Sequence, residues 1–270
     1  MKIGSVFFIL LGTLLCYKTY AHNGHRSDRP VLHVNNGKWP ECAIELDPSL
    51  TQKDIRNFGK EAFTFIYFKG GNSAKIFKKG HFEISMPYII TGKINDASPH
   101  WNNTFTHPDS VHWLVNESKR LKYPQFNFRI GIAKRIDLGV TFIKLPNLTN
   151  YGFTGIDLRY ALIADSTRNF YLTSRASFGA LLGVNDLKHN LIAADVSITK
   201  SFSLFSPYLG LSFALSNQKE FSPLVVLNRE WIPSVVGIIG TEFNYRVLSI
   251  GAECNISKLN MYSIKVGVKI

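Results

Sequence analysis

After residue 21 the sequence has no uninterrupted apolar run of about 20 residues, the length that a membrane-spanning helix needs. Helical membrane spans are therefore excluded from that part of the chain. The chain is also poor in cysteine, with three in 270 residues, and Cys16 lies in the N-terminal apolar stretch. Cys42 and Cys254 form neither a disulfide framework nor a metal-binding spacing, so they are either joined to each other or two separate buried thiols.

Acidic residues are scarce as well. The chain has 19 Asp and Glu against 31 Lys and Arg, which gives a net charge of +12. This balance favours an acidic partner, and nucleic acid, anionic lipid and phosphorylated sugar are the alternatives.

The N-terminus narrows these alternatives. A positively charged start precedes the apolar run IGSVFFILLGTLLC (Ile3 to Cys16), and Thr19 and Ala21 supply the small residues found before a cleavage site. We therefore predict a secretory signal peptide at residues 1–21. For an exported protein we expect no nucleic-acid partner.

From Gly80 onward, apolar residues occupy every second position in about ten segments. In the first segment Phe82, Ile84, Met86 and Tyr88 share one face. The others lie within residues 126–132, 138–142, 156–162, 170–182, 192–198, 209–215, a less regular 235–243, 248–256 and 262–270. Each is close to the roughly 9–11 residues that a tilted membrane strand requires.

The links between these segments alternate between short and long. Short turns fall at residues 134–135, 164–169, 203–206 and 244–245, and the longest links are residues 91–124 and 216–232. Bacterial outer-membrane barrels show this asymmetry, with the short turns in the periplasm. We predict an all-β protein whose residues 80–270 form an antiparallel up-and-down transmembrane β-barrel of about ten strands. Its location would be the outer membrane of a Gram-negative bacterium, with the N-terminus in the periplasm.

Residues 22–79 are irregular and basic, with one helical pattern. Apolar residues recur at three- and four-residue spacing from Ile55 to Phe63, after Ser49 or Thr51 as the N-cap. We predict a short amphipathic helix, which either plugs the barrel or lies in the periplasm.

The chain ends on a strict two-residue alternation, YSIKVGVKI (Tyr262 to Ile270). In a closed barrel the last strand pairs with the first, which satisfies its backbone groups. The ending resembles the C-terminal recognition signal of outer-membrane barrel proteins, although Ile270 stands where Phe is usual. The resemblance implies the barrel assembly machinery as a partner.

Three stretches carry a wider resemblance. They are CAIELDPSLTQKDIRNFGKE (Cys42 to Glu61), IAKRIDLGVTFIKLP (Ile132 to Pro146) and SPYLGLSFA (Ser206 to Ala214). They resemble a family of proteobacterial outer-membrane β-barrel proteins that has no assigned activity. This resemblance implies location and fold only, because the motifs are structural.

Residues between the apolar positions of each strand should point into the barrel, and their charges nearly balance. The predicted lumen residues are Glu83, Arg129, Asp137, Asp157, Arg159, Arg175, Asp195, Glu253, Lys265 and, at the strand end, Lys269. A balanced set can pair internally and needs no water column, whereas a one-signed lumen suits a selective pore. A barrel of about ten strands is also narrow. We therefore predict a largely closed, salt-bridged lumen.

The surplus positive charge then lies outside the lumen. Lys119, Arg120 and Lys122 would sit at the outer rim, as candidates for contact with lipopolysaccharide phosphates. The competing interpretation is solvated charge without a ligand. Trp101, Trp113 and Tyr123 in the same link are candidates for the aromatic interface belt.

One stretch offers candidate chemistry. His100, His107 and His112 are a weak candidate metal site, and His107 with Asp109 and Ser110 could be imagined as hydrolytic. Neither spacing matches a known ligand or triad pattern, so we expect no cofactor, no metal and no enzymatic activity.

The sequence thus favours a structural or surface-interaction barrel in contact with outer-membrane lipid. The first alternative is a narrow pore or transporter for a small or lipophilic solute, gated by the N-terminal helix. The second is a soluble, exported, lipocalin-like binding protein.

Overall fold

The computed structural model describes residues 48–67, 71–95, 97–102, 119–144, 152–183, 187–222 and 225–270. The helices are α2 (Gln52–Ile66) and α3 (Pro99–Asn102). The strands are β1 (Phe82–Thr91), β2 (Lys122–Pro124), β3 (Phe126–Ala133), β4 (Ile136–Lys144), β5 (Gly152–Asp165), β6 (Phe170–Leu182), β7 (Leu187–Lys200), β8 (Phe205–Glu220), β9 (Glu230–Tyr245), β10 (Leu248–Ile256) and β11 (Met261–Lys269).

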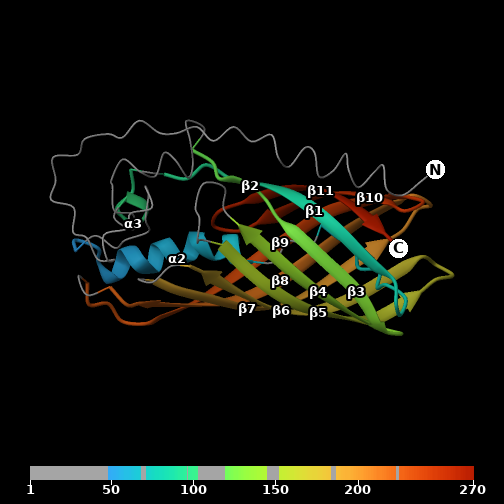
Figure 1. Ribbon diagram of the computed structural model, residues 1–270, viewed down its shortest axis with the longest axis horizontal. Coiled ribbons are helices and arrows are strands. Elements are labelled where there is room, and N and C mark those ends of the chain that lie inside the picture. The colour runs from blue at the N-terminus through green and yellow to red at the C-terminus, as the bar shows by residue number, and fades with distance from the viewer. Residues whose placement is uncertain are drawn as a thin grey trace. The chain divides into compact units, whose positions relative to one another are not determined.

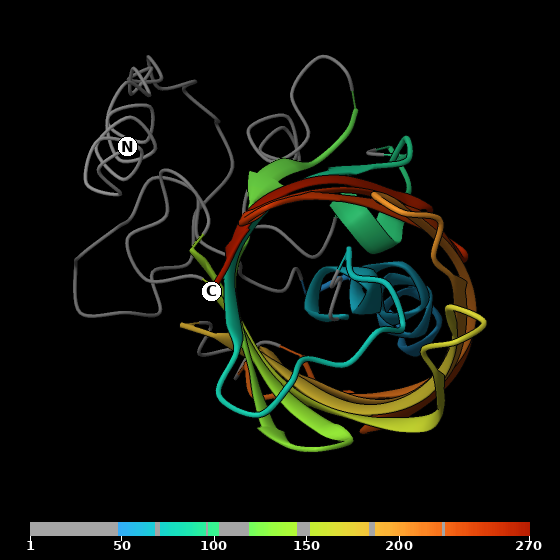
Figure 2. The same ribbon diagram turned by 90° about the vertical axis from the view of Figure 1, so that its right-hand side faces the viewer.

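The strands form one antiparallel sheet that closes on itself (Figures 1 and 2). Consecutive strands pair from β3 to β11, and β1 pairs with β11 from Glu83–Lys269 to Thr91–Met261. Two further bonds seal this seam, because the N–H groups of Phe82 and Ile270 each donate to the other residue's carbonyl, at 2.8 and 2.9 Å. Both β2 and β3 pair with β1, so the wall is a closed ten-stranded barrel with one extra short strand. The predicted fold class is confirmed.

The two ends of the barrel differ in their connections. At the short-turn end, where β3, β5, β7 and β9 finish, the links are residues 134–135, 166–169, 201–204 and 246–247. At the long-loop end, where β1, β4, β6, β8 and β10 finish, the links include residues 92–121 and 221–229. Both of the longest predicted links therefore lie at the same end, as predicted, although the links 183–186 and 257–260 at that end are as short as 166–169 at the other.

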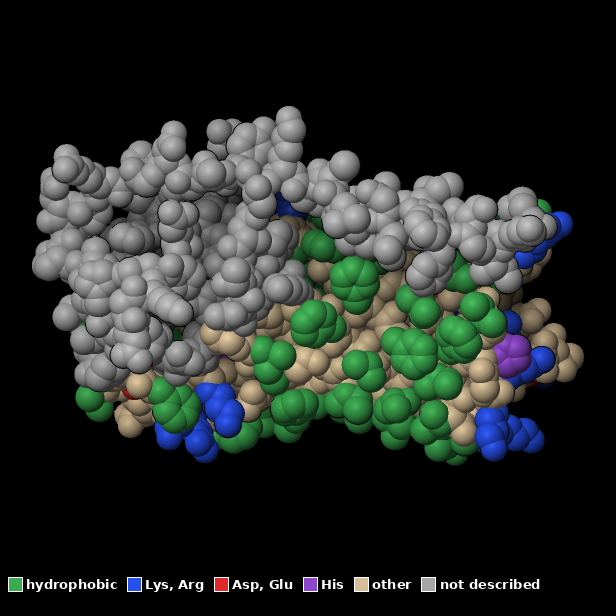
Figure 3. Space-filling model, viewed as in Figure 1, with side chains coloured by type: hydrophobic (Ala, Val, Ile, Leu, Met, Phe, Trp, Pro, Cys, Tyr) green, Lys and Arg blue, Asp and Glu red, His purple; other side chains and the backbone are tan. Residues whose placement is uncertain are grey.

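The barrel is apolar outside and polar inside. The predicted outward residues Ile84, Phe128, Val140 and Leu158 are exposed, and Ile264 of β11 is 62% exposed. Their neighbours in sequence, such as Ser85, Arg129 and Asp157, are buried in the lumen. Figure 3 shows hydrophobic side chains across the outer wall, with Lys and Arg near its two ends. A soluble β-sandwich or lipocalin-like protein would bury such side chains, whereas a membrane barrel turns them toward lipid.

Several strands are longer than the membrane requires. The prediction of about 9–11 residues per strand fits β1, β4, β10 and β11, but β5 to β9 have between 13 and 16 residues. The same five strands contact α2. Their extra length therefore extends the wall around the helix.

The helix starts where its sequence provides an N-cap. The Thr51 hydroxyl accepts from the Asp54 N–H, and the Asp54 carboxylate accepts from the Thr51 N–H at 3.1 Å, which forms a capping box. The alternative N-cap, Ser49, precedes the helix by three residues. The helix extends to Ile66, beyond the predicted Ile55 to Phe63. In the part of the chain that the structure describes, no helix is long and apolar enough to cross a membrane.

Figure 2 shows α2 inside the ring of strands. Its buried side chains include Ile55, Phe58, Phe63 and Ile66. They form one cluster with inward apolar residues near the long-loop end: Ile143, Phe153, Leu187, Leu191, Val236 and Ile238. Burial of each large side chain contributes about 1.5–3 kcal/mol, so the helix is strongly held.

Two aromatic residues expected in the interface belt lie inside instead. Trp101 of α3 is 1% exposed and packs edge-on against Phe58 of α2, with ring centroids 5.0 Å apart. Its indole Nε1 donates to Glu61 at 2.6 Å. Tyr123 of β2 is also 1% exposed. Both were misassigned because α2 offers an apolar surface inside the barrel, whereas Trp113 lies outside the described residues.

Candidate functional site

A stretch of extended chain follows α2 through the lumen. We call residues 71–80 the threaded segment and, together with α2, the plug. The Gly71 N–H donates to Glu253 at 3.1 Å, and farther along the Ala74 N–H donates to Thr199 at 2.7 Å. The Ser73 hydroxyl donates to Glu242 at 2.7 Å. The barrel wall therefore holds this segment through polar side chains.

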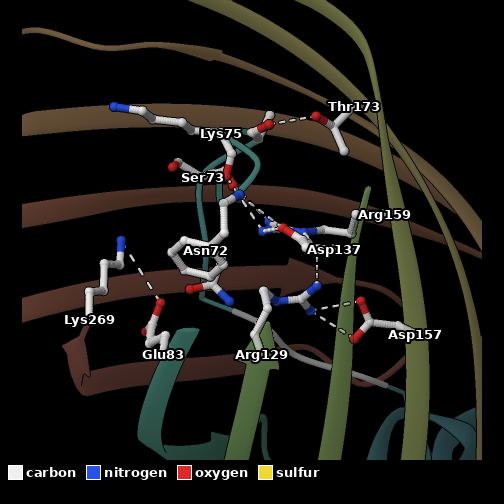
Figure 4. A network of polar contacts seen from close by, with 12 residues as sticks. Asn72, Ser73, Lys75, Glu83, Arg129, Asp137, Asp157, Arg159, Thr173 and Lys269 are labelled. Atoms are coloured by element: carbon white, nitrogen blue, oxygen red, sulfur yellow. Dashed lines mark hydrogen bonds and ion pairs between the residues drawn. The ribbon is translucent and has the colours of Figure 1, made fainter. Parts of the chain in front are cut away.

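The densest part of the lumen is a cluster of two arginines and two aspartates (Figure 4). Arg129 contacts Asp137 at 2.6 Å and Asp157 at 2.7 Å, and Arg159 contacts Asp137 at 2.6 Å. Their side chains are at most 6% exposed. The register explains the cluster, because Asp137 lies opposite Arg159 in the β4–β5 pair.

The same cluster also binds the threaded segment. Arg159 donates to the carbonyl of Ser73 at 2.9 Å, and the Phe77 N–H donates to Asp137 at 3.4 Å. The wall and the plug thus share one network of charges and hydrogen bonds.

A second ion pair lies where the helix ends. Arg175 contacts Asp195 at 2.7 Å, and these residues face each other in the β6–β7 pair. The Tyr67 hydroxyl donates to Asp195 at 3.3 Å and accepts from Arg175 at 3.1 Å. Tyr67 is buried, and its hydroxyl thus links the end of the helix to this ion pair inside the lumen.

A third group closes the seam from the inside. The Lys265 ammonium contacts Glu83 at 2.7 Å and Glu242 at 2.9 Å, and it also binds Asn72 of the threaded segment. Lys269 contacts Glu242 at 2.8 Å. This group joins β1, β9 and β11 through charge-assisted hydrogen bonds.

Inward glycines leave the space for these contacts. A Cβ at Gly131 would lie 2.2 Å from the carbonyl oxygen of Lys78, and one at Gly179 would lie 2.3 Å from that of Ile66. A Cβ at Gly139 would lie 2.2 Å from the Asp157 carboxylate. The backbone of the plug and the side chains of the ion pairs therefore fit only because these wall positions have no side chain.

A small cavity lies within the network. It is bordered by Asn72, Arg129, Arg175, Tyr208 and Glu253 and has a volume of about 30 Å³. This is room for about one or two water molecules.

The structure places all the residues proposed for the lumen charge network inside the barrel, where they form three separate groups of ion pairs and the hydrogen-bonded Glu253. Each lies on the inner wall, and within the described residues each acid except Glu253 has a cationic partner at 4.0 Å or less. Glu253 instead accepts from Tyr208 at 2.9 Å and from Asn255 at 2.8 Å. Sequence reasoning missed Glu242 because it lies in the irregular segment 235–243.

That irregularity has a structural cause. Val235 and Ile239 face outward, whereas Val236 and Ile238 face inward and belong to the cluster around α2. The strand is thus apolar on both faces, which hides its period and with it the inward position of Glu242.

The rim candidates lie at the long-loop end, where Lys119 and Lys122 are exposed. The Arg120 guanidinium instead donates to the carbonyl of Thr91 at 3.1 Å. Every Asp and Glu in the described ranges is partly or fully buried. The positive surplus therefore lies on the surface.

The candidate metal and hydrolytic residues are described only in part. His100 lies 3.6 Å from the Glu61 carboxylate of α2, whereas His107, Asp109, Ser110 and His112 lie outside the described residues. Among the residues that were placed, no three His, Cys, Asp or Glu side chains are grouped so that they could hold a metal. Cys254 is a half-buried free thiol, and Cys42 lies outside the described ranges.

Neither a family model nor a curated protein matches the chain. Among solved structures, it is similar to the translocator domain of autotransporter NalP from Neisseria meningitidis, at 10% identity and a TM-score of 0.38, over 79% of this chain and 93% of that one. It is similar to Ail of Yersinia pestis in complex with the heparin analogue sucrose octasulfate, at 12% identity and a TM-score of 0.32, over 71% and 99%. It is also similar to the outer membrane protein OprG from Pseudomonas aeruginosa, at 9% and 0.32, over 74% and 99%. These similarities concern architecture alone.

The closed wall, its apolar exterior and its ion-paired interior define the class of the protein. The chain has the fold of an outer-membrane β-barrel.

The central role of Asp137 can be tested by replacing its charge. We expect Asp137→Asn to lower the free energy of unfolding by about 3–5 kcal/mol, because it leaves Arg159 buried without a carboxylate partner. Denaturant unfolding of the protein in lipid vesicles measures this change. Asp165→Asn is the control, because its carboxylate faces an exposed Arg168 at 3.8 Å and should contribute less than about 1 kcal/mol. Equal, small effects of both substitutions would contradict the role of the network.

Proposed function

We propose that the protein is a plugged outer-membrane barrel of a Gram-negative bacterium, which acts as a structural or surface-interaction protein and not as an enzyme or an open channel. The observation that carries this proposal is the filled lumen. In the plug, α2 begins at Gln52, beside Asn228, and the threaded segment ends at Gly80, whose N–H donates to Gly131 at 2.8 Å.

Both parts of the plug oppose opening. α2 buries an apolar face against the wall, and the threaded segment is bound by residues of β4, β5, β7, β9 and β10. Opening of a gated pore would require all these contacts to break at once. The charged side chains of the lumen would then lose their hydrogen bonds to the plug. The closed barrel is therefore the better supported function.

The orientation in the membrane follows from the links between strands. Outer-membrane barrels keep short turns in the periplasm and longer loops outside. We therefore assign the short-turn end to the periplasm and the long-loop end to the cell surface. The barrel assembly machinery, as a partner of the last strand, stays a prediction.

The long-loop rim offers a surface for anionic lipid. Lys188 of β7 and Lys219 of β8 are directly opposite each other, and their neighbours His189 and Gln218 point inward, so both ammonium groups project from the outer face. Like charges in this position repel. Trp231 on the adjacent strand is 54% exposed, as expected for an aromatic residue at the membrane interface.

A lipopolysaccharide phosphate between the two lysines would relieve this repulsion through charge-assisted hydrogen bonds. Within the described residues neither lysine is part of an ion pair, and the Lys219 ammonium lies 4.5 Å from the ring centre of Phe221. We propose it as a contact for lipopolysaccharide, together with the exposed Lys119 and Lys122 and their neighbour Arg120.

The closed lumen is tested by electrical recording. We expect wild-type protein in planar bilayers to show no sustained conductance, and a variant that lacks residues 48–76 to conduct small ions through the vacated lumen. Lys53→Gln, on the exposed face of α2, is the control and should stay silent. Heat-modifiable gel migration verifies that each variant is folded. Sustained opening of the wild type would contradict the proposal, and a folded but silent deletion variant would contradict the plug as the cause of closure.

The lipid contact is tested with vesicles that contain or lack lipopolysaccharide. Each lysine near an anionic surface contributes about 1 kcal/mol, so Lys188→Gln with Lys219→Gln should weaken lipopolysaccharide binding by roughly 30-fold. The matched control is Lys200→Gln at the short-turn end, which should leave binding unchanged. An equal effect of both variants would indicate general charge attraction instead of a site.

A further inference from the structure

The helix begins at the long-loop end of the barrel. The Gln52 side-chain amide donates to the carbonyl of Asn228 at 3.1 Å and accepts from the N–H of the same residue at 2.8 Å. Arg56 pairs with Glu230, the first residue of β9, at 3.0 Å. These contacts place the N-terminal turn of α2 at the mouth where β8 ends and β9 begins.

The helix then runs inward. Ile66, its last residue, lies against Gly179 of β6, and the next residue, Tyr67, reaches Arg175 and Asp195 deeper in the lumen. β6 runs toward the long-loop end, so Arg175 lies closer to the short-turn end than Gly179 does. The chain from Ile66 to Tyr67 is therefore directed toward the short-turn end.

The threaded segment completes the passage. Phe77 contacts Asp137 near the start of β4, and a Cβ on Gly131, near the end of β3, would meet the carbonyl of Lys78. Gly80, with a φ of +85°, turns the chain into β1 at the short-turn end. The described chain therefore enters the barrel at one mouth and leaves it at the other.

We infer that the N-terminal end of α2 opens onto the cell surface, so that the described chain passes through the barrel from the outside to the periplasm. The β1–β11 seam is hydrogen-bonded along its length, so the wall offers no side exit. This inference rests on the orientation in the proposed function. It puts the start of α2 on the other side of the membrane from the periplasmic N-terminus that the sequence analysis predicts.

With this topology, the start of α2 contributes to the surface at the long-loop end of the barrel. The first turns of α2 present Lys53 and Lys60 as exposed side chains, and Arg229, which precedes the Glu230 partner of Arg56, is exposed as well. The start of α2 thus extends the basic surface of the long-loop end, which fits an acidic partner outside the cell.

Cysteine labelling in intact cells tests the inference. Single cysteines replace Lys53 in α2, Lys258 in the β10–β11 link and Lys134 in the β3–β4 turn, in a background with Cys16→Ser, Cys42→Ser and Cys254→Ser. All three lysines are exposed. A large maleimide that does not cross the outer membrane is added before or after permeabilisation, and labelling is read as a shift on a gel. Heat-modifiable migration verifies the fold of each variant.

We expect K53C and K258C to be labelled in intact cells, and K134C only after permeabilisation. If K53C behaves like K134C, the threaded topology is wrong. If K134C is labelled in intact cells and K258C is not, the orientation in the proposed function fails. In that case, the threaded topology is still supported if K53C and K258C show the same labelling pattern. The two failures are thereby distinguished.

Discussion

The structure depends on one constraint, which is that polar groups enclosed by the barrel must satisfy one another. Water has little access to the lumen, and a buried charge without a partner costs several kcal/mol. Arg129, Asp137, Asp157 and Arg159 meet this constraint as a compact cluster with contacts of 2.6–2.7 Å. The same constraint applies to the backbone of any chain inside the barrel, because each N–H and C=O also needs a partner.

The wall of the lumen is apolar around α2 and polar around the threaded segment, because these two parts of the plug satisfy their backbone N–H and C=O groups in different ways. A helix satisfies its own backbone, so the wall around α2 can be apolar, as Leu191, Val236 and Ile238 are. An extended segment has no internal hydrogen bonds. The wall around residues 71–80 therefore supplies polar partners such as Glu242 and Thr199. The charges of the lumen thus close the barrel and also hold the backbone that runs through it.

The strands of the barrel wall could be predicted from the sequence because apolar and polar residues alternate along each strand, and this pattern is local. Lipid outside and polar groups inside enforce that alternation, and Glu83, Arg129 and Asp157 could be placed in the lumen from their positions alone. The irregular β9 and the misassigned Trp101 share one cause. Both contact α2, and the presence of an apolar helix inside the barrel could not be deduced from the period of the strands.

The path of the plug was beyond sequence reasoning for a different reason. The helix was predicted from its spacing, but its direction depends on contacts across more than 170 positions, such as that of Gln52 with Asn228. The inward glycines were a usable signal. Gly131, Gly139 and Gly179 fall on the inner face, where a missing side chain indicates that something approaches the wall closely.

Amide hydrogen exchange of the lipid-reconstituted protein tests the central claim most directly. If the wall satisfies the backbone of the threaded segment, the N–H groups of Gly71, Ser73 and Ala74 should exchange as slowly as those in the middle of the barrel strands. Exchange at the rate of an exposed loop, while the strands remain protected, would show an open and hydrated lumen and would contradict the account.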